Sequence, residues 1–241
     1  YNNDNDAFIN TMKQKEALEN YQIAYKLNPT RLDIYSNLLM STYYIYRYSV
    51  HDRFQYAKQF NSLLNVNTAD IISHTTKTIN KTKLKIGYIG YDFNKLEHPI
   101  TCFVKHIFEN HTSSFQVYCY QASTKISTHF QSNLDLPLYT AMIPGIITRN
   151  ISHLSDEDCA KLIKEDDIDI LVELMHHTAG NRLRILSYKP APIQISYCAF
   201  PGTTGIDAID YKIIDTSTYT SMNQRFSTEK LLRMKNGFHC Y

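Results

Sequence analysis

Two mainly apolar runs, at residues 168–174 and 193–200, stand out in the hydrophobic pattern of this chain. The first run ends in a polar loop with the sequence Met-His-His-Thr at 175–178, and the second ends in Pro-Gly-Thr-Thr-Gly at 201–205. Short apolar runs bounded by turn residues are typical of buried strands. Two such strands that lead into loops of His, Thr and Gly predict a ligand site at the carboxyl edge of an α/β sheet.

The pattern changes from helical to alternating strands and helices at residue 83. Further strands are expected at 84–90, 115–120 and 211–214, and helices at 99–110, 155–166 and 181–187. Ser155 is a plausible N-cap for the second of these helices, with Glu157 and Asp158 in its first turn. This alternation predicts a doubly wound, mostly parallel sheet whose right-handed crossovers place the strand-to-helix loops at one edge. Residues 121–153 give no clear pattern.

The segment before residue 65 is helical in pattern. Ala17, Tyr21, Ala24 and Leu27 form one stripe, and Pro29 ends that helix. A second helix is expected at 31–43, a linking helix at 44–64 and a connector at 65–83. The helix pair resembles the back half of a tetratricopeptide repeat, although any helical hairpin can show the same spacing. Such a half-repeat cannot bury its face alone, so we expect further repeats upstream.

Composition and charge exclude several classes of protein. The 241 residues are 43% hydrophobic and 20% charged, as in an ordinary globular protein, and the net charge of +2 argues against a nucleic-acid partner. Because no stretch approaches 18 apolar residues, neither a membrane span nor a membrane partner is expected. The five Cys are scattered without a CxxC pair, which favours a reducing compartment. We interpret both ends of the chain as cuts inside a longer protein.

His98, which directly precedes Pro99, is the first candidate for chemistry. Proline holds the preceding residue in extended geometry, here at the expected start of a helix. A histidine at that place can donate to a phosphate or a sugar hydroxyl, or act as a base near neutral pH. The alternative is a surface histidine in a helix-entry turn.

The loops after the two apolar runs supply the other candidates. Adjacent His176 and His177 are a poor metal site, because zinc sites need His at helical spacing or Cys partners, so no metal is expected. The first loop either hydrogen-bonds a polar ligand or is a polar turn capped by Thr178 or Asn181. In the second loop, the glycines and threonines of 202–205 suit close backbone approach to a ligand, but a tight turn explains them equally well.

Several motifs follow one another in an order and spacing that resemble a known family. These motifs are Lys85-Ile86-Gly87-Tyr88-Ile89, Asp92-Phe93, His98-Pro99, Asp169-Ile170-Leu171-Val172-Glu173-Leu174, His177-Thr178, Pro190-Ala191-Pro192-Ile193-Gln194, Pro201-Gly202-Thr203-Thr204-Gly205 and Asp210-Tyr211. The family is that of the nucleocytoplasmic protein O-glycosyltransferases, which contains O-GlcNAc transferases, SPINDLY-type O-fucosyltransferases and bacterial relatives. The resemblance extends over residues 83–241.

The resemblance implies a Rossmann-like N-terminal lobe of a GT-B glycosyltransferase at 83–241, with the C-terminal lobe absent. It places the end of a tetratricopeptide-like array at 1–45 and a linking helix with a connector at 46–82. It also implies that His98 is a catalytic residue close to the transferred sugar. The residues expected to line the donor and substrate cleft are His177, Thr178, Pro201, Gly202 and Thr203.

The function implied is transfer of GlcNAc or fucose from UDP-GlcNAc or GDP-fucose to Ser or Thr of intracellular proteins, with inversion and without a metal or other cofactor. Protein or peptide acceptors are expected to bind the repeats, in the cytoplasm or nucleus, while residues 1–241 alone are expected to be inactive. The chain departs from the family at His176, where a Gly is usual, and at 197–201, where Trp-x-Gly-Tyr-Pro is usual. The alternative is therefore a non-catalytic protein-binding module with a degenerate lobe.

Overall fold

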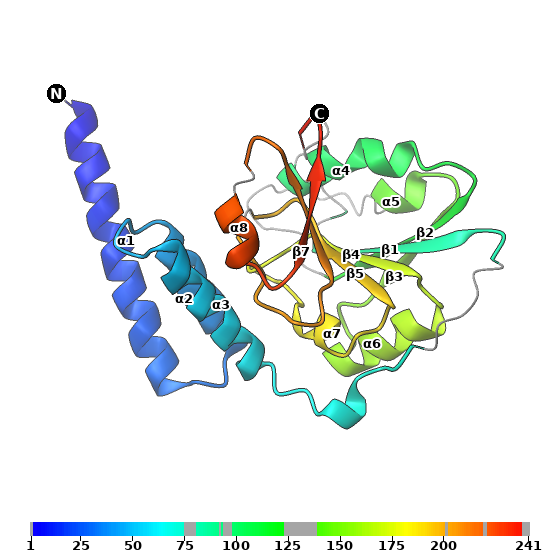
Figure 1. The fold of residues 1–241 in the computed structure, drawn as a ribbon, viewed down its shortest axis with the longest axis horizontal. Coiled ribbons are helices and arrows are strands. Elements are labelled where there is room, and N and C mark those ends of the chain that lie inside the picture. Colours follow the sequence, from blue (N-terminus) through cyan, green and yellow to red (C-terminus); the bar gives the residue numbers. More distant parts are fainter. Residues whose placement is uncertain are drawn as a thin grey trace, which may run out of the picture.

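The computed structural model describes residues 2–74, 81–91, 93, 98–122, 139–200, 202–218 and 221–237. In this part of the chain a group of helices precedes a sheet that carries the other helices (Figure 1). The first group consists of α1 (Asn2–Leu27), α2 (Leu32–Tyr43), α3 (Val50–Leu63) and the short 3₁₀ helix η1 (Thr68–Asp70). Pro29 ends the first helix as the sequence predicts, since α1 stops at Leu27.

The strands of the described residues form one parallel sheet in the order β3-β2-β1-β4-β5-β6-β7. Their bounds are β1 Leu84–Gly90, β2 Phe115–Gln121, β3 Ile146–Asn150, β4 Ile170–Glu173, β5 Ile193–Ser196, β6 Tyr211–Asp215 and β7 Lys230–Met234. Strand order reverses between β1 and β4, which is the point where α/β sheets bind ligands beyond the carboxyl ends of their strands.

Helices cover both faces of the sheet. Figure 1 shows α4 (Pro99–Glu109) and α5 (Tyr139–Met142) on one face and α6 (Asp156–Glu165) and α7 (Arg184–Ser187) on the other. The last helix, α8 (Ser221–Arg225), lies beside α2 and α3. The predicted N-cap of α6 is confirmed, because the Ser155 hydroxyl accepts the Asp158 N–H at 3.1 Å.

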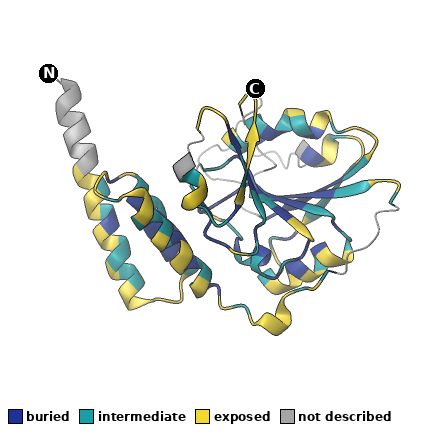
Figure 2. Ribbon diagram, in the orientation of Figure 1, coloured by how far each residue is buried: buried dark blue, intermediate teal, exposed yellow. Residues whose placement is uncertain are grey.

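The buried apolar side chains form two clusters, one on each face of the sheet. Figure 2 shows that buried residues lie along the strands and on parts of the helices that cover them. The first cluster joins the α4 side chains Val104 and Phe108 to β1 and β2. The second contains α6 and α7 and continues into the helical group through Tyr35 and Phe60, which are at most 1% exposed. Packing is therefore continuous from α2 and α3 into the sheet, and the predicted domain boundaries at 45 and 82 stay predictions.

The predicted α/β, Rossmann-like fold is confirmed, and the strands and helices expected from residue 83 onward are present with small shifts at their ends. β3, β7, α5 and α8 were not predicted. The linking helix expected at 44–64 begins only at Val50, because Ser49 and Asp52 form a capping box there: Ser49 Oγ accepts the Asp52 N–H at 3.1 Å, and the Asp52 carboxylate accepts the Ser49 N–H at 2.8 Å.

Candidate functional site at the carboxyl edge of the sheet

The loops after β4 and β5 lie together at the carboxyl edge, next to the point where strand order reverses. Sheet register places Glu173 beside Ser196 and Ser196 beside Lys212, so the three side chains share one face. Glu173 is 2% exposed, and its carboxylate accepts the backbone N–H groups of Met175 and His176. The carboxylate therefore turns the chain sharply at the end of β4.

Burial raises the pKa of Glu173 to about 7, although the backbone N–H groups of His176 and Met175 and the charge of Lys212 act in the opposite direction. Lys212 is 2% exposed and donates to the carbonyl of Phe200 at 2.8 Å. Burial lowers the pKa of Lys212, and the carboxylates of Glu229 and Glu173 oppose this shift. A buried group of charges thus lies directly under the loop after β5.

His176 has a φ of 50°, in the left-handed region that glycine adopts most readily. The family resemblance implies a Gly here, and the backbone keeps the conformation that a Gly would favour. The imidazole turns into the protein: Nε2 donates to the Gly202 carbonyl at 2.9 Å, and the ring packs against Phe200 at 5.2 Å. Burial, with the nearby Lys212, lowers the pKa of His176 well below its usual value, so the ring is neutral.

His177 bridges the helical group and the loop after β5. Its Nδ1 lies 3.1 Å from the Ser36 hydroxyl of α2, and its Nε2 lies 2.8 Å from the Thr204 carbonyl. A carbonyl only accepts, so Nε2 carries the proton and Nδ1 accepts from Ser36. Burial lowers the pKa of His177 to about 4, which keeps the ring neutral. The side chain is 1% exposed with both nitrogens engaged, so it supports the loops, and its predicted ligand contact stays a prediction.

Thr178 and Asn181 close the loop after β4. The Thr178 hydroxyl donates to the Met175 carbonyl, and the Asn181 amide donates to the Thr178 carbonyl at 2.9 Å and to Ser36 Oγ at 3.4 Å. Of the two alternatives left open by the sequence, a capped polar turn is what these bonds form. Ligand binding by Thr178 stays a prediction.

The buried side chain of Glu229, which is 0% exposed, hydrogen-bonds the loop after β5. Its carboxylate accepts the Thr203 hydroxyl at 2.6 Å, and it also accepts the backbone N–H of Thr204 at 2.7 Å and the Thr204 hydroxyl. Burial acts to raise the pKa of Glu229, but the charge of Lys212 and these hydrogen bonds outweigh it, and the pKa is lowered. Glu229 therefore stays ionised and fixes the shape of the loop.

Two glycines let this loop approach the helical group. A Cβ at Gly202 would lie 2.2 Å from the hydroxyl of Tyr43, and a Cβ at Gly205 would lie 2.1 Å from the carbonyl oxygen of Ala57. Gly205 also has a φ of 78°. These glycines therefore allow close approach to the protein's own helices, and the ligand contacts predicted for Gly202 and Thr203 stay predictions. Pro201, another predicted cleft residue, lies outside the described residues.

A tight turn follows β5 at Cys198. This residue has a φ of 80°, and the Ala199 N–H donates to the Tyr197 carbonyl at 3.1 Å, which defines a γ-turn of the rare kind with positive φ. Strained backbone persists where the surrounding structure determines it, and it gathers at functional sites. His176 and Cys198 both have such a conformation, and they lie just beyond the ends of the adjacent strands β4 and β5.

His98 lies at the start of α4, on the β1 side of the edge. It is the N-cap of the helix, with Pro99 following, and its Nδ1 accepts the Ile100 N–H at 3.3 Å. The proton of the neutral ring is therefore on Nε2, which makes that nitrogen a hydrogen-bond donor. The structure joins Gly202, Thr203 and His177 in one assembly, while His98 comes from the neighbouring loop across the β1–β4 reversal.

Sequence alone did not identify the residues that hold this edge, namely Ser36, Tyr43, Lys212 and Glu229. Glu173 and Asp215 both end strands, but they have different partners. Glu173 binds the turn after its own strand, whereas Asp215 accepts the Thr218 N–H at 2.7 Å.

Among the described residues there is no cluster of His, Cys, Asp and Glu that could hold a metal ion. No helix there has the length and apolar character to cross a membrane.

The chain is similar to known proteins in sequence and in structure. The family described as Glycosyl transferase family 41 matches residues 43–240. A probable UDP-N-acetylglucosamine–peptide N-acetylglucosaminyltransferase SPINDLY of Hordeum vulgare is 34% identical over 159 residues, which are 66% of this chain and 16% of that protein. A UDP-N-acetylglucosamine–peptide N-acetylglucosaminyltransferase of Caenorhabditis elegans is 32% identical over 164 residues, 66% of this chain and 13% of that protein.

An O-GlcNAc transferase mutant from Thermobaculum terrenum has the same fold. The TM-score is 0.82 at 24% identity, and the match covers 95% of this chain and 42% of that chain. The chain therefore spans a small part of the length of the relatives that it matches.

Proposed function

The chain belongs to glycosyl transferase family 41, and from that premise we propose that the protein is a protein O-glycosyltransferase. It transfers a sugar, GlcNAc or fucose, from UDP-GlcNAc or GDP-fucose to Ser or Thr hydroxyls of other proteins. The relatives are named for transfer of N-acetylglucosamine to peptides, which supports a peptide acceptor. The SPINDLY relatives support placing this chain near that branch of the family.

The observation that carries the proposal is the assembly of loops 174–178 and 202–205 on one rim, next to the β1–β4 reversal. Buried Glu173, Lys212 and Glu229 hold these loops from below, and His177 ties them to α2. Because the loops of this rim are already fixed, the free-energy cost of rearranging them when a substrate binds is small.

His98 is best suited to bind the substrate as a donor. Because Nδ1 accepts the Ile100 N–H, the ring carries its proton on Nε2, which makes Nε2 the donor nitrogen of this side chain. We assign to it a hydrogen bond to an oxygen of the transferred sugar or its phosphate. Use of Nε2 as a base would require the other tautomer and the loss of the cap on α4. Proton removal from the acceptor would then be assisted by a leaving phosphate oxygen or by another group.

The same proposal includes four further points: inversion at the transferred sugar, independence from metals and other cofactors, a cytoplasmic or nuclear location, and binding of the acceptor by tetratricopeptide repeats. They rest on the family. The non-catalytic alternative rested on His176 and on the altered segment 197–201. The inward bond of His176 to Gly202 shows how the histidine fits a glycine conformation without extending from the rim, which supports the enzyme.

A transfer assay tests the proposal. Full-length protein is incubated with radiolabelled UDP-GlcNAc or GDP-fucose and a protein extract, and label in protein is counted. We expect label from one donor with the full-length protein and none with residues 1–241 alone, because the second lobe is expected to bind most of the nucleotide. Absence of transfer from both donors by a folded full-length protein would reject the function.

A further inference from the structure

A pocket of about 190 Å³ lies between the helical group and the sheet, beside the rim described above. Its walls come from the end of α2, the first turns of α3, the loop after β5 and the segment around α8. The residues that line it and carry the argument are Tyr43, Val50, Arg53, Phe54, Thr203 and Phe226. Because Thr203 belongs to the rim loop, a molecule in this pocket lies next to the proposed transfer site.

Among the described residues that line the pocket there is one cation and no carboxylate. The Arg53 guanidinium lies over the Tyr43 ring, 4.9 Å from its centroid, and its Nε donates to the Thr42 carbonyl at 3.3 Å. No ion pair within the described residues involves Arg53. Stacking and the Nε bond fix the plane of the guanidinium, so its terminal nitrogens are oriented to donate together to a carboxylate.

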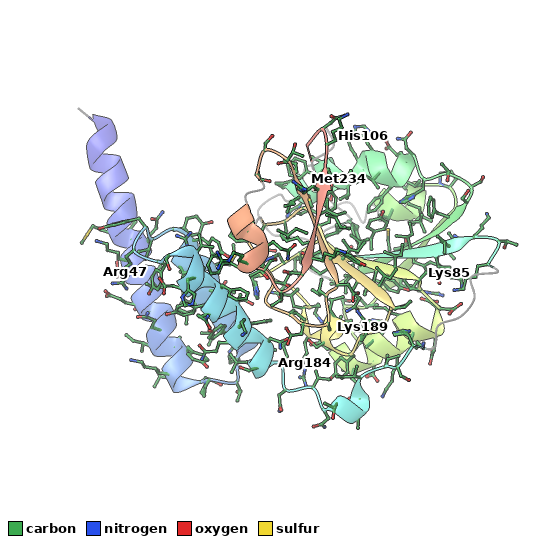
Figure 3. All side chains as sticks on the ribbon, viewed as in Figure 1. Arg47, Lys85, His106, Arg184, Lys189 and Met234 are labelled. Carbon is green, nitrogen blue, oxygen red and sulfur yellow. The ribbon has the colours of Figure 1, made fainter. Side chains whose placement is uncertain are left out.

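Apolar side chains surround the charge. Phe54 and Phe226 meet edge to face at 6.0 Å, and Val50, which is 54% exposed, forms the outer margin. Arg47 lies on the side of the helices away from the sheet (Figure 3) and hydrogen-bonds Tyr48. Lys58 lies over the Phe54 ring, 5.8 Å from its centroid, and does not line the pocket, whereas Arg53 does. An apolar stem that ends in a carboxylate matches this arrangement, whereas a phosphate is usually bound by several cations or backbone N–H groups.

We propose that this pocket binds an acidic side chain of the acceptor polypeptide, with the carboxylate on Arg53 and the stem against Phe54 and Phe226. The inference rests on the proposed transferase function for its meaning, since it makes Arg53 a determinant of acceptor choice. Acceptors with Glu or Asp a few residues from the modified hydroxyl bind in preference to neutral ones. Loop 202–205 then lies between the anchored side chain and the site of transfer.

Binding is measured first, without catalysis. The probe is a fluorescein-labelled, ten-residue peptide of alternating Ser and Glu, and its partner peptide carries Gln in place of every Glu. Fluorescence anisotropy with residues 1–241 should show the Glu peptide binding about tenfold more tightly than the Gln peptide, and weakening as salt rises. Equal affinity for both peptides would overturn the proposal.

Variants distinguish binding in this pocket from attraction of the acidic peptide by the overall charge of the chain. Arg53→Gln should weaken the Glu peptide about tenfold, whereas Arg31→Gln, which removes the same charge from the opposite end of α2, should leave it unchanged. Val50→Asp serves if Arg53→Gln fails to fold, because Val50 is exposed in the first turn of α3, where Asp is well tolerated. It should also weaken the Glu peptide. Unchanged binding by Val50→Asp, or by folded Arg53→Gln, would contradict the site.

A transfer assay with the full-length protein distinguishes this proposal from the function on which it rests. If the protein transfers sugar but does not distinguish Glu-flanked from Gln-flanked serine peptides, the pocket assignment is wrong and the function stands. If the protein transfers no sugar while Arg53 still selects the Glu peptide, the function is wrong and the binding site stands.

Discussion

Substitution of Ser36 by Ala probes the connection between the helical group and the rim. The Ser36 hydroxyl donates to His177 Nδ1 at 3.1 Å and accepts from the Asn181 amide at 3.4 Å. Both Ser36 and His177 are at most 2% exposed, so water does not readily replace the lost hydroxyl. Ser36→Ala leaves Nδ1 of His177 buried without a donor.

An unsatisfied buried polar group costs about 1–3 kcal/mol, and the lost bond to Asn181 adds little because it is long. A loss of about 2 kcal/mol lowers the Tm of a chain of this size by about 4–8 °C. The neutral ring can relieve the cost by moving its proton to Nδ1, but Nε2 then faces the Thr204 carbonyl without a hydrogen. Either response loosens loop 202–205.

Thermal unfolding followed by circular dichroism measures the effect. Ser41→Ala is the matched control, because Ser41 lies on the same helix and its hydroxyl donates only to the Asn37 carbonyl one turn earlier. The control should change stability by about 0.5 kcal/mol or less. If Ser36→Ala loses no more stability than Ser41→Ala, the hydrogen bonds of His177 do not connect α2 to loop 202–205.

Three further predictions concern the same edge. Gly205→Ala should cost about 3 kcal/mol or more, whereas Gly145→Ala, also at positive φ but with no atom of the described residues within 4 Å of the added Cβ, should cost only about 1–2 kcal/mol of backbone strain in urea denaturation. Glu229→Gln should cost about 3–5 kcal/mol by removing a negative charge that opposes the burial of Lys212 and by weakening the hydrogen bonds from Thr203 and Thr204, and a double variant with Lys212→Met should regain part of that stability in the same assay. Because the pKa of His177 is about 4 in the fold and near 6.5 when unfolded, its neutral form contributes stability that is complete above pH 6.5 and lost as pH falls toward 4. The stability difference between wild type and His177→Phe should therefore shrink between pH 7.5 and pH 4.5, and a constant difference would exclude a lowered pKa.

The strands at the centre of the sheet could be predicted because most of their residues are apolar and at least partly buried. The edge strands could not. Most residues of β7 are exposed, and no residue of β3 is fully buried, so neither strand gives a long apolar run. The capping residue Ser155 was predictable because its effect is local to one turn.

The supports of the rim could not be predicted for a different reason. Ser36 is 141 residues from His177 in sequence, and Glu229 is 25 residues from Thr204. Each of these side chains is an ordinary polar residue in its local segment, and only the packed sheet shows that it is buried. The family resemblance identified the loops, but it did not show that His177 uses both of its nitrogens inside the protein.

The rate of sugar transfer by full-length protein carrying His98→Ala tests the account most directly. His106→Ala is the control, because His106 lies in the last turn of the same helix and contacts Glu109. If the edge of the sheet is half of a transferase site, the rate falls at least about a hundredfold for His98→Ala and stays near wild type for His106→Ala. An unchanged rate for His98→Ala would contradict the account.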